Sequence, residues 1–308
     1  MAVMLSRLSI ATLLSVLLIL AGCRPRTEQS VHSDSEIIVA AAANLTDSFD
    51  ELSREFTKQS GIKVVLSFGA TADLAKQIEN GAPFDVFAAA DVKHVSALEE
   101  KGLLTPGSNA IYARGSLVIW IPPGSTIKVV RIEDLTDKRI ERIAIAKPDI
   151  APYGQAALET LRAVNLWPQL ESRVVYGMNV SQVRQFVASG NAEVGFLPRS
   201  MVKPGEGTYF EIPQQLHQPI DQALGLVRAS AKQDAARQFS AFVLGTAGQA
   251  ILRRYGYETV VRSQKSVVRS SAFEVRRSEL GVWSSASSFE HIAFCFLPSA
   301  FCLLPSDS

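Results

Sequence analysis

Four residues stand where an apolar, strand-like run passes into the expected start of a helix: Asn44, Thr71, Tyr153 and Val180. The first N–H groups of a helix have no partner inside the helix, and they form the positive end of the helix dipole. Such a start is suited to binding an anion. The four junctions therefore predict anion binding, although every α/β protein has strand-to-helix junctions and none is specific alone.

Strand-like and helical segments alternate through the middle of the chain. The predicted strands are 36–42, 62–68, 83–90, 116–123, 142–148, 173–177, 192–198, 207–213 and 222–228. The predicted helices are 45–60, 71–81, 92–102, 153–165, 180–191, 232–245 and 246–256. Thr71, Asp91 and Asn179 are the predicted N-caps, because their side chains can accept from first-turn amides. The alternation indicates an α/β architecture with parallel strands.

The order of the elements also predicts two lobes. We expect the chain to leave the first lobe near residue 115 and to return near residue 220. Lobe I would comprise 37–115 plus 221–262, and lobe II 116–220. Two crossovers between two lobes make a cleft that can close by hinge motion. Ligands bind at the carboxyl ends of strands in such sheets, so each lobe would present one pair of junctions to the cleft.

The composition excludes several classes of function. The 308 residues are 47% hydrophobic and 20% charged, which is ordinary for one large or two medium globular domains. The formal net charge is +1, so no overall charge favours nucleic acid or an anionic membrane surface. The three cysteines and four histidines form no CxxC, HExxH or similar spacing. Neither a metal-dependent enzyme nor a nucleic-acid-binding protein is predicted.

A secreted hydrolase on an α/β scaffold is an alternative from a different class. The chain has no GxSxG motif, and neither His94 nor His217 has a nucleophile to pair with. We expect both histidines at the surface, His94 on a helix face and His217 in a polar turn. Asp85 and Asp91 flank a strand, which could suggest acid–base chemistry. A turn contact for Asp85 and a helix cap for Asp91 explain them more simply.

The N-terminus indicates export. Arg7 precedes the apolar stretch 8–21, which is short for a membrane span and is typical of a signal peptide. It ends in "LAGC", which resembles a bacterial lipobox, in which Cys23 becomes the lipidated first residue. We interpret 1–22 as a signal peptide and 23–36 as the lipidated cysteine and a polar tether. The mature protein would be periplasmic or at the cell surface, anchored to the membrane through Cys23. An ordinary signal peptide with a chance cysteine is the alternative.

Residues 263–308 are interpreted as a disordered C-terminal extension outside the fold. "CFLPSAF" and "CLLPS" form a near-repeat that is rich in Ser, Phe and Cys and has no helical or strand period. A disulfide between Cys295 and Cys302 would require an oxidising compartment.

Three segments resemble a known family. "AAANLTDSFDELSREFTKQSG", "SFGATADLAKQIENGAPFDVFAAAD" and "FVLGTAGQAILRRYGY" are similar to the periplasmic molybdate-binding proteins of bacterial molybdate ABC importers. The resemblance implies a type II periplasmic-binding-protein fold, with two α/β lobes around a hinged cleft. It also implies a monomer that is not an enzyme and uses no cofactor. Such a protein would bind molybdate or tungstate and deliver it to the membrane permease of an ABC importer.

The resemblance also assigns the ligand contacts. In the family a tetrahedral oxyanion is held by hydroxyl, amide and backbone N–H donors, without a counter-charge or a metal ion. The matching positions are Asn44, Thr71, Tyr153 in "PYG", and Val180 acting through its backbone. Some relatives carry a ligand-binding Tyr at a later strand end, where this chain has Pro198, which offers neither a hydroxyl nor an N–H. Either Tyr153 supplies that phenol from the other loop, or it packs against the lobe and the site lacks one donor.

A pocket lined only by hydrogen-bond donors has a defined preference. A fully deprotonated oxyanion only accepts hydrogen bonds. A protonated phosphate carries an O–H that would stay unpaired there, at a cost of about 1–3 kcal/mol if buried. Such a pocket argues against phosphate, weakly against sulfate and not at all against tungstate. A protein of the same fold for sulfate, phosphate or an organic anion stays open, as does an extracytoplasmic anion sensor.

Overall fold

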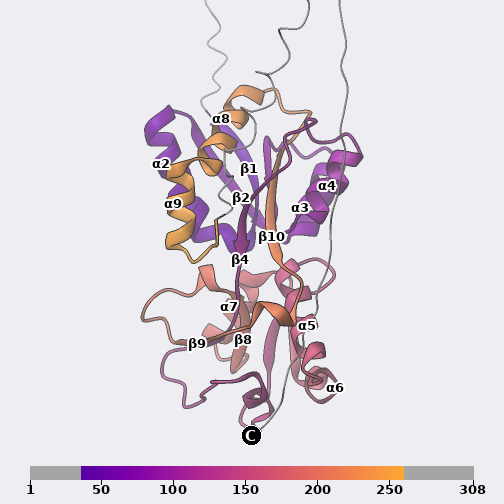
Figure 1. Cartoon of the computed structure of the whole chain (residues 1–308), viewed down its shortest axis with the longest axis vertical. Coiled ribbons are helices and arrows are strands. Elements are labelled where there is room, and N and C mark those ends of the chain that lie inside the picture. Colours follow the sequence, from indigo (N-terminus) through magenta and orange to yellow (C-terminus); the bar gives the residue numbers. More distant parts are fainter. Residues whose placement is uncertain (1–35, 260–308) are drawn as a thin grey trace, which may run out of the picture. The chain divides into compact units, whose positions relative to one another are not determined.

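The computed structural model describes residues 36–259, which contain two five-stranded sheets (Figure 1). The first sheet has the order β2-β1-β3-β10-β4 and the second has the order β7-β6-β8-β5-β9. The strands are β1 Glu36–Ala42, β2 Lys63–Gly69, β3 Val86–Ala88, β4 Ala110–Gly115, β5 Leu117–Ile121, β6 Ile143–Ala146, β7 Val174–Gly177, β8 Val194–Pro198, β9 Thr208–Glu211 and β10 Ile220–Leu226. Every strand predicted from the sequence is present, with ends that differ by a few residues.

Helices cover both sheets. The α-helices are α2 Thr46–Ser60, α3 Thr71–Glu79, α4 Lys93–Glu100, α5 Pro152–Ala163, α6 Trp167–Leu170, α7 Val180–Ala188, α8 Gln233–Leu244 and α9 Thr246–Arg254. The 3₁₀ turns are η1 Ala43–Leu45, η2 Ile132–Thr136, η3 Glu171–Arg173, η4 Arg199–Met201 and η5 Gln214–Leu216. Figure 1 shows α2 and α9 to one side of the first sheet and α3 and α4 to the other. In α2 the apolar stripe of Phe49, Leu52 and Phe56 is buried, as its helical spacing requires.

Both sheets are mixed, which corrects the expectation of parallel strands throughout. β1 runs parallel to β2 and β3, and β6 runs parallel to β7 and β8. β10 is antiparallel to β3 and β4, and β5 is antiparallel to β8 and β9. The reason is that β5 and β10 each enter their sheet from the other one. They therefore begin at the edge where the parallel strands finish.

The chain passes between the sheets at two places. β4 ends at Gly115 and β5 begins at Leu117, so only Ser116 separates them. The return leads from β9 through η5 into β10. The sequence analysis does not predict β4, because this strand is held by distant pairing rather than by a local apolar pattern. Arg114 of β4 forms a two-point ion pair with Asp221 of β10, 107 positions later, at 2.6 and 2.9 Å.

This arrangement places the carboxyl ends of two neighbouring parallel strands in each sheet directly before a helix or a 3₁₀ turn. β1 leads into η1 and α2, and β2 leads into α3. In the second sheet β6 leads into α5, and β7 leads into α7. These four strand ends carry the four junctions that the sequence analysis selects.

Several interpretations fall outside the described residues. They are the signal peptide, lipidated Cys23, nearly all of the tether, and the 263–308 extension with Cys295 and Cys302. Within residues 36–259, no helix combines the length and the apolar character needed to cross a membrane.

Candidate functional site

One small pocket brings all four junction residues together. The space among its lining atoms amounts to about 210 Å³, part of which is open to solvent. Its lining residues are Ala42, Ala43, Asn44, Gly69, Ala70, Thr71, Ala90, Ala151, Pro152, Tyr153, Asn179 and Val180. They come from both sheets, and none of them carries a charged side chain. A ligand in this pocket would meet small side chains, main chain and a few neutral polar groups.

Thr71 contributes a hydroxyl that already accepts one hydrogen bond from the protein. It is the first residue of α3, and Ala70 occupies the N-cap position without a side-chain cap hydrogen bond. The expectation that Thr71 caps the helix is therefore wrong. The N–H of Ala90 donates to Thr71 Oγ1 at 3.2 Å instead. This bond leaves the Thr71 hydroxyl hydrogen for an acceptor in the pocket.

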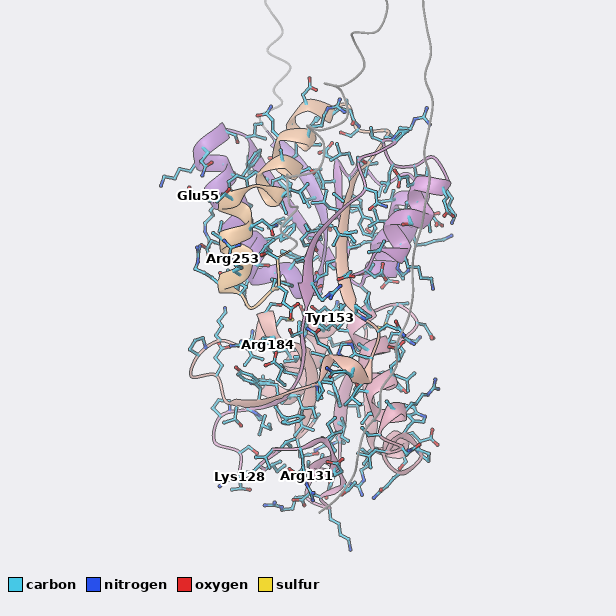
Figure 2. All side chains as sticks on the ribbon, in the orientation of Figure 1. Glu55, Lys128, Arg131, Tyr153, Arg184 and Arg253 are labelled. Carbon is cyan, nitrogen blue, oxygen red and sulfur yellow. The ribbon has the colours of Figure 1, made fainter. Side chains whose placement is uncertain are left out.

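Tyr153 reaches the pocket from the second sheet. Pro152 opens α5, where its missing N–H costs nothing. A Cβ on Gly154 would lie 2.1 Å from the carbonyl oxygen of Ala146, so only glycine lets this first turn pack on the end of β6. The Tyr153 side chain is 2% exposed, and Figure 2 shows it between the two sheets. Its hydroxyl accepts a hydrogen bond from Gln222 Nε2 at 3.0 Å.

The Tyr153 phenol is a neutral donor. Burial raises its pKa well above the usual value, the nearby Tyr257 raises it further, and the hydrogen bond from Gln222 acts in the opposite direction. The phenol therefore stays protonated at neutral pH. It can donate to an anion without carrying a charge.

Val180 begins α7 and offers its main chain. Asn179 is the N-cap, as predicted, and its Oδ1 accepts from the N–H of Gln182 at 3.0 Å. Within residues 36–259, the N–H groups of Thr71, Tyr153 and Val180 donate to no protein acceptor. First-turn amides of this kind are free to bind an anion.

Asn44 lines the pocket, but its side-chain amide is occupied by the protein. Asn44 Nδ2 donates to Gln222 Oε1 at 2.8 Å and to the hydroxyl of Tyr257 at 2.9 Å. The Asn44 carbonyl accepts from the hydroxyls of Tyr257 at 3.0 Å and Ser200 at 3.1 Å. Both amide hydrogens are used, so what Asn44 can offer a ligand is its main-chain N–H.

Comparison with known proteins identifies the group to which this arrangement belongs. Residues 37–258 match the model of a family described as bacterial extracellular solute-binding protein. The chain belongs to this family.

Individual relatives agree with this assignment. The solute-binding protein is 37% identical over 228 residues to the molybdate-binding protein ModA of Rhodobacter capsulatus, covering 73% of this chain and 88% of the relative. It is 36% identical over 231 residues to ModA of Azotobacter vinelandii, covering 72% and 90%. The solved structure of the Azotobacter vinelandii periplasmic molybdate-binding protein superposes with a TM-score of 0.70 at 32% identity, covering 73% of this chain and 99% of the other. The type II two-lobe fold and the resemblance found in the sequence motifs are thereby confirmed.

Pro198 of this solute-binding protein stands at the end of β8, where it pairs with Leu117, and it does not line the pocket. Two positions later, Ser200 places its hydroxyl on the Asn44 carbonyl. The segment after β8 thus contacts the first sheet through Ser200, close to the pocket.

The histidines and aspartates to which the sequence assigns no catalytic role form hydrogen bonds within the protein. Asp85 accepts from the N–H of Ile38 at 2.7 Å and from the Ser230 hydroxyl at 2.6 Å. These partners are 47 and 145 positions away, so the expectation of a local turn contact is wrong, and Asp85 joins distant segments instead. Val92, not Asp91, is the N-cap residue of α4, but Asp91 still accepts from the first-turn N–H of His94 at 2.9 Å.

The histidine placements need correction. His94 Nδ1 pairs with Asp91 at 2.8 Å and is only partly exposed. His217 is 9% exposed, with Nδ1 at 2.7 Å from the Gln218 carbonyl. The expectation of two surface histidines is therefore wrong for His217, because its turn packs where the chain returns to the first sheet. Among the described residues, no cluster of three His, Cys, Asp or Glu side chains could hold a metal ion.

Sequence reasoning missed three residues around the pocket: Tyr112, Gln222 and Tyr257. All three are buried and bond directly to Asn44 or Tyr153, or to each other. A weak signal existed for Gln222, since it is the polar first residue of the predicted strand 222–228. Nothing local marks Tyr112 or Tyr257, because their partners lie far away in the sequence.

Proposed function

We propose that this protein captures molybdate, or the nearly identical tungstate, in the pocket formed by Asn44, Thr71, Tyr153 and Val180. The observation that carries the proposal is that these residues line one pocket without any charged side chain. The relatives that cover most of this chain are named as molybdate-binding proteins. Their pairwise identity of 36–37% supports a shared ligand.

The donor set suits a dianion. The hydroxyls of Thr71 and Tyr153 each accept one hydrogen bond from a protein N–H group, and each keeps its hydrogen for the ligand. The first-turn amides of α3, α5 and α7 add main-chain donors and the positive ends of their helix dipoles. Each hydrogen bond to a charged group contributes about 1.5–3 kcal/mol. A handful of them accounts for tight binding even after the loss from closing the two lobes.

The proposed role is transport rather than catalysis. The solute-binding protein would act as a monomer and hand the oxyanion to the membrane permease of an ABC importer. It would chemically change nothing and need no cofactor. Lobe I would be 37–115 plus 221–262 and lobe II 116–220, with the ligand between them. We further propose lipidation at Cys23, which would hold the exported protein at the membrane by its N-terminal tether.

Isothermal titration calorimetry tests the proposal. The mature chain without residues 1–22 is titrated with molybdate, tungstate, sulfate and phosphate in turn. We expect one-to-one binding of molybdate and tungstate, with sulfate and phosphate at least about a hundredfold weaker. Tight binding of sulfate or phosphate instead would mean that the protein has the same fold but a different ligand. If none of the four anions binds, the proposal is contradicted, and organic anions should be tested next.

A further inference from the structure

Gln222 is a fully buried polar side chain that joins the two sheets beside the pocket. It lies in β10 of the first sheet and is 0% exposed. Its Oε1 accepts from Asn44 Nδ2 at 2.8 Å. The Tyr112 hydroxyl lies 3.1 Å from the same oxygen and 3.0 Å from the Ala89 carbonyl oxygen, and these two acceptors share its single hydrogen. Its Nε2 donates to the hydroxyl of Tyr153, in the second sheet, at 3.0 Å. Which end of the Gln222 amide faces Tyr153 is decided by the Asn44 side chain.

The Asn44 carbonyl can only accept hydrogen bonds, and this fixes the direction of the other bonds in the network. The Tyr257 hydroxyl gives its hydrogen to the Asn44 carbonyl, so its oxygen must accept from Asn44 Nδ2. The second hydrogen of Nδ2 then goes to Gln222 Oε1. This places Gln222 Nε2 against Tyr153 and makes the Tyr153 oxygen an acceptor. The single Tyr153 hydrogen has no acceptor among residues 36–259, which leaves it for the pocket.

The backbone leaves room for this bond. A Cβ at Gly115 would lie 1.9 Å from the Tyr153 hydroxyl oxygen and 2.8 Å from Gln222 Nε2. Gly115 is the last residue of β4, at the crossover between the sheets. Its φ requires no glycine, so the missing side chain serves the approach of the phenol to the amide rather than the backbone conformation.

We propose that Gln222 is a positioning residue that fixes Tyr153 as a hydrogen-bond donor and so makes the pocket selective for oxyanions without an O–H group. The inference rests on the proposed function. A phenol free to rotate can donate to a bare oxygen or accept from a protonated one. A phenol whose oxygen already accepts from Gln222 is a poorer acceptor for a second hydrogen, so hydrogen phosphate loses Tyr153 as a partner for its O–H.

A double-mutant cycle on the full mature chain tests this proposal. Tyr153→Phe removes the donor, and Gln222→Met removes the group that orients it. We expect each to weaken molybdate binding about tenfold or more. The double variant should bind no more weakly than Tyr153→Phe alone, because Gln222 acts on the ligand only through the Tyr153 hydroxyl. Gln169→Met, the same change at an exposed position of α6, is the matched control and should bind like wild type.

The ratio of the phosphate Kd to the molybdate Kd is the readout that a merely structural role of Gln222 would leave unchanged. A general loosening of the pocket would weaken molybdate and phosphate binding in proportion. In Gln222→Met the freed phenol can accept from the phosphate O–H, so the ratio of phosphate Kd to molybdate Kd should fall about tenfold. Gln222→Glu should weaken molybdate binding more than Gln222→Met does, since a carboxylate takes the Tyr153 hydrogen and adds negative charge next to the anion.

The role of Gln222 is overturned if the affinity losses of the two single variants add in the double variant, or if the ratio of phosphate Kd to molybdate Kd is unchanged. In either case the proposed function stands as long as the wild type binds molybdate. A wild type that binds none of the oxyanions would overturn the proposed function together with this inference. If no Gln222 variant folds, the proposal is tested by the tyrosine Raman doublet. The contribution of Tyr153 is obtained by subtracting the spectrum of Tyr153→Phe from that of the wild type. The proposal requires an accepting phenol in the free protein that becomes a donor when molybdate is added.

Discussion

The main-chain N–H of Ala72 donates to the carbonyl of Ile150 at 3.1 Å. Ala72 lies in the first turn of α3, which follows the first sheet, and Ile150 lies in the segment after β6 of the second sheet. Next to the pocket, the two sheets are therefore linked by main chain as well as by side chains. Separation of the two sheets at the pocket would break this bond.

Hydrogen exchange at Ala72 should report on lobe closure. Molybdate stabilises the closed arrangement, so the exchange rate of the Ala72 amide should fall by at least about tenfold when the ligand is saturating. NMR-detected exchange measures this. The Gly81 amide, which bonds to the Ile78 carbonyl at the other end of α3, is the internal control. Equal slowing at both positions would indicate general stabilisation rather than closure.

Replacing Thr71 by valine should weaken oxyanion binding. Valine keeps the shape but removes the hydroxyl, so the expected loss is about 1.5–3 kcal/mol of binding free energy. It also leaves the Ala90 N–H without its acceptor, which should cost about 1–3 kcal/mol of folding stability. Thr71→Ser retains the hydroxyl and is the matched control. Calorimetric titration and urea unfolding measure the two effects, and unchanged affinity would remove Thr71 from the site.

Stability should fall at alkaline pH because of buried tyrosines. Burial raises the pKa of Tyr112, Tyr153 and Tyr257 above 10.0 in the folded protein. Above pH 10 the unfolded chain loses these protons and the folded chain keeps them. Their contribution is thus complete below about pH 10 and declines as the pH rises towards the folded values. The loss of stability should therefore grow as the pH rises from about 10 to about 11.

Urea unfolding at about pH 9 and about pH 11 measures this loss. Tyr112→Phe should lose less stability between the two pH values than wild type does, because one titrating group is gone. An equal loss in both proteins would show that Tyr112 does not titrate differently in the folded and unfolded chains.

The ion pair of Asp47 and Lys203 also links the two halves but should matter little. Lys203 Nζ lies 2.8 Å from Asp47 Oδ1, and the side chains are 46% and 25% exposed. Exposed pairs contribute about 0.2–1 kcal/mol and are screened by salt. Asp47→Asn should therefore weaken molybdate binding less than about fivefold at low salt, with no difference at about 1 M salt. Glu36→Gln, which breaks an exposed pair within the first sheet, is the control.

Much of the secondary structure follows from local sequence. The apolar runs and helical stripes predict every strand except β4, and they place the starts of α3, α5 and α7 to within a residue. Gly61, predicted to end α2, does so with a φ of 74°. Such features depend on hydrogen bonds and side chains within a few residues of one another. They can therefore be read without knowing the rest of the fold.

The sequence by itself determined that four strand-to-helix junctions exist and that each can offer donors to an anion. Only the tertiary structure decided that they converge on one pocket, and that the Asn44 amide faces Gln222 and Tyr257, 178 and 213 positions away. It also decided the antiparallel course of β10 and the orientation of the Tyr153 hydroxyl. The physical reason is that helix starts are local, whereas the direction of a buried hydrogen bond depends on every distant group that shares it.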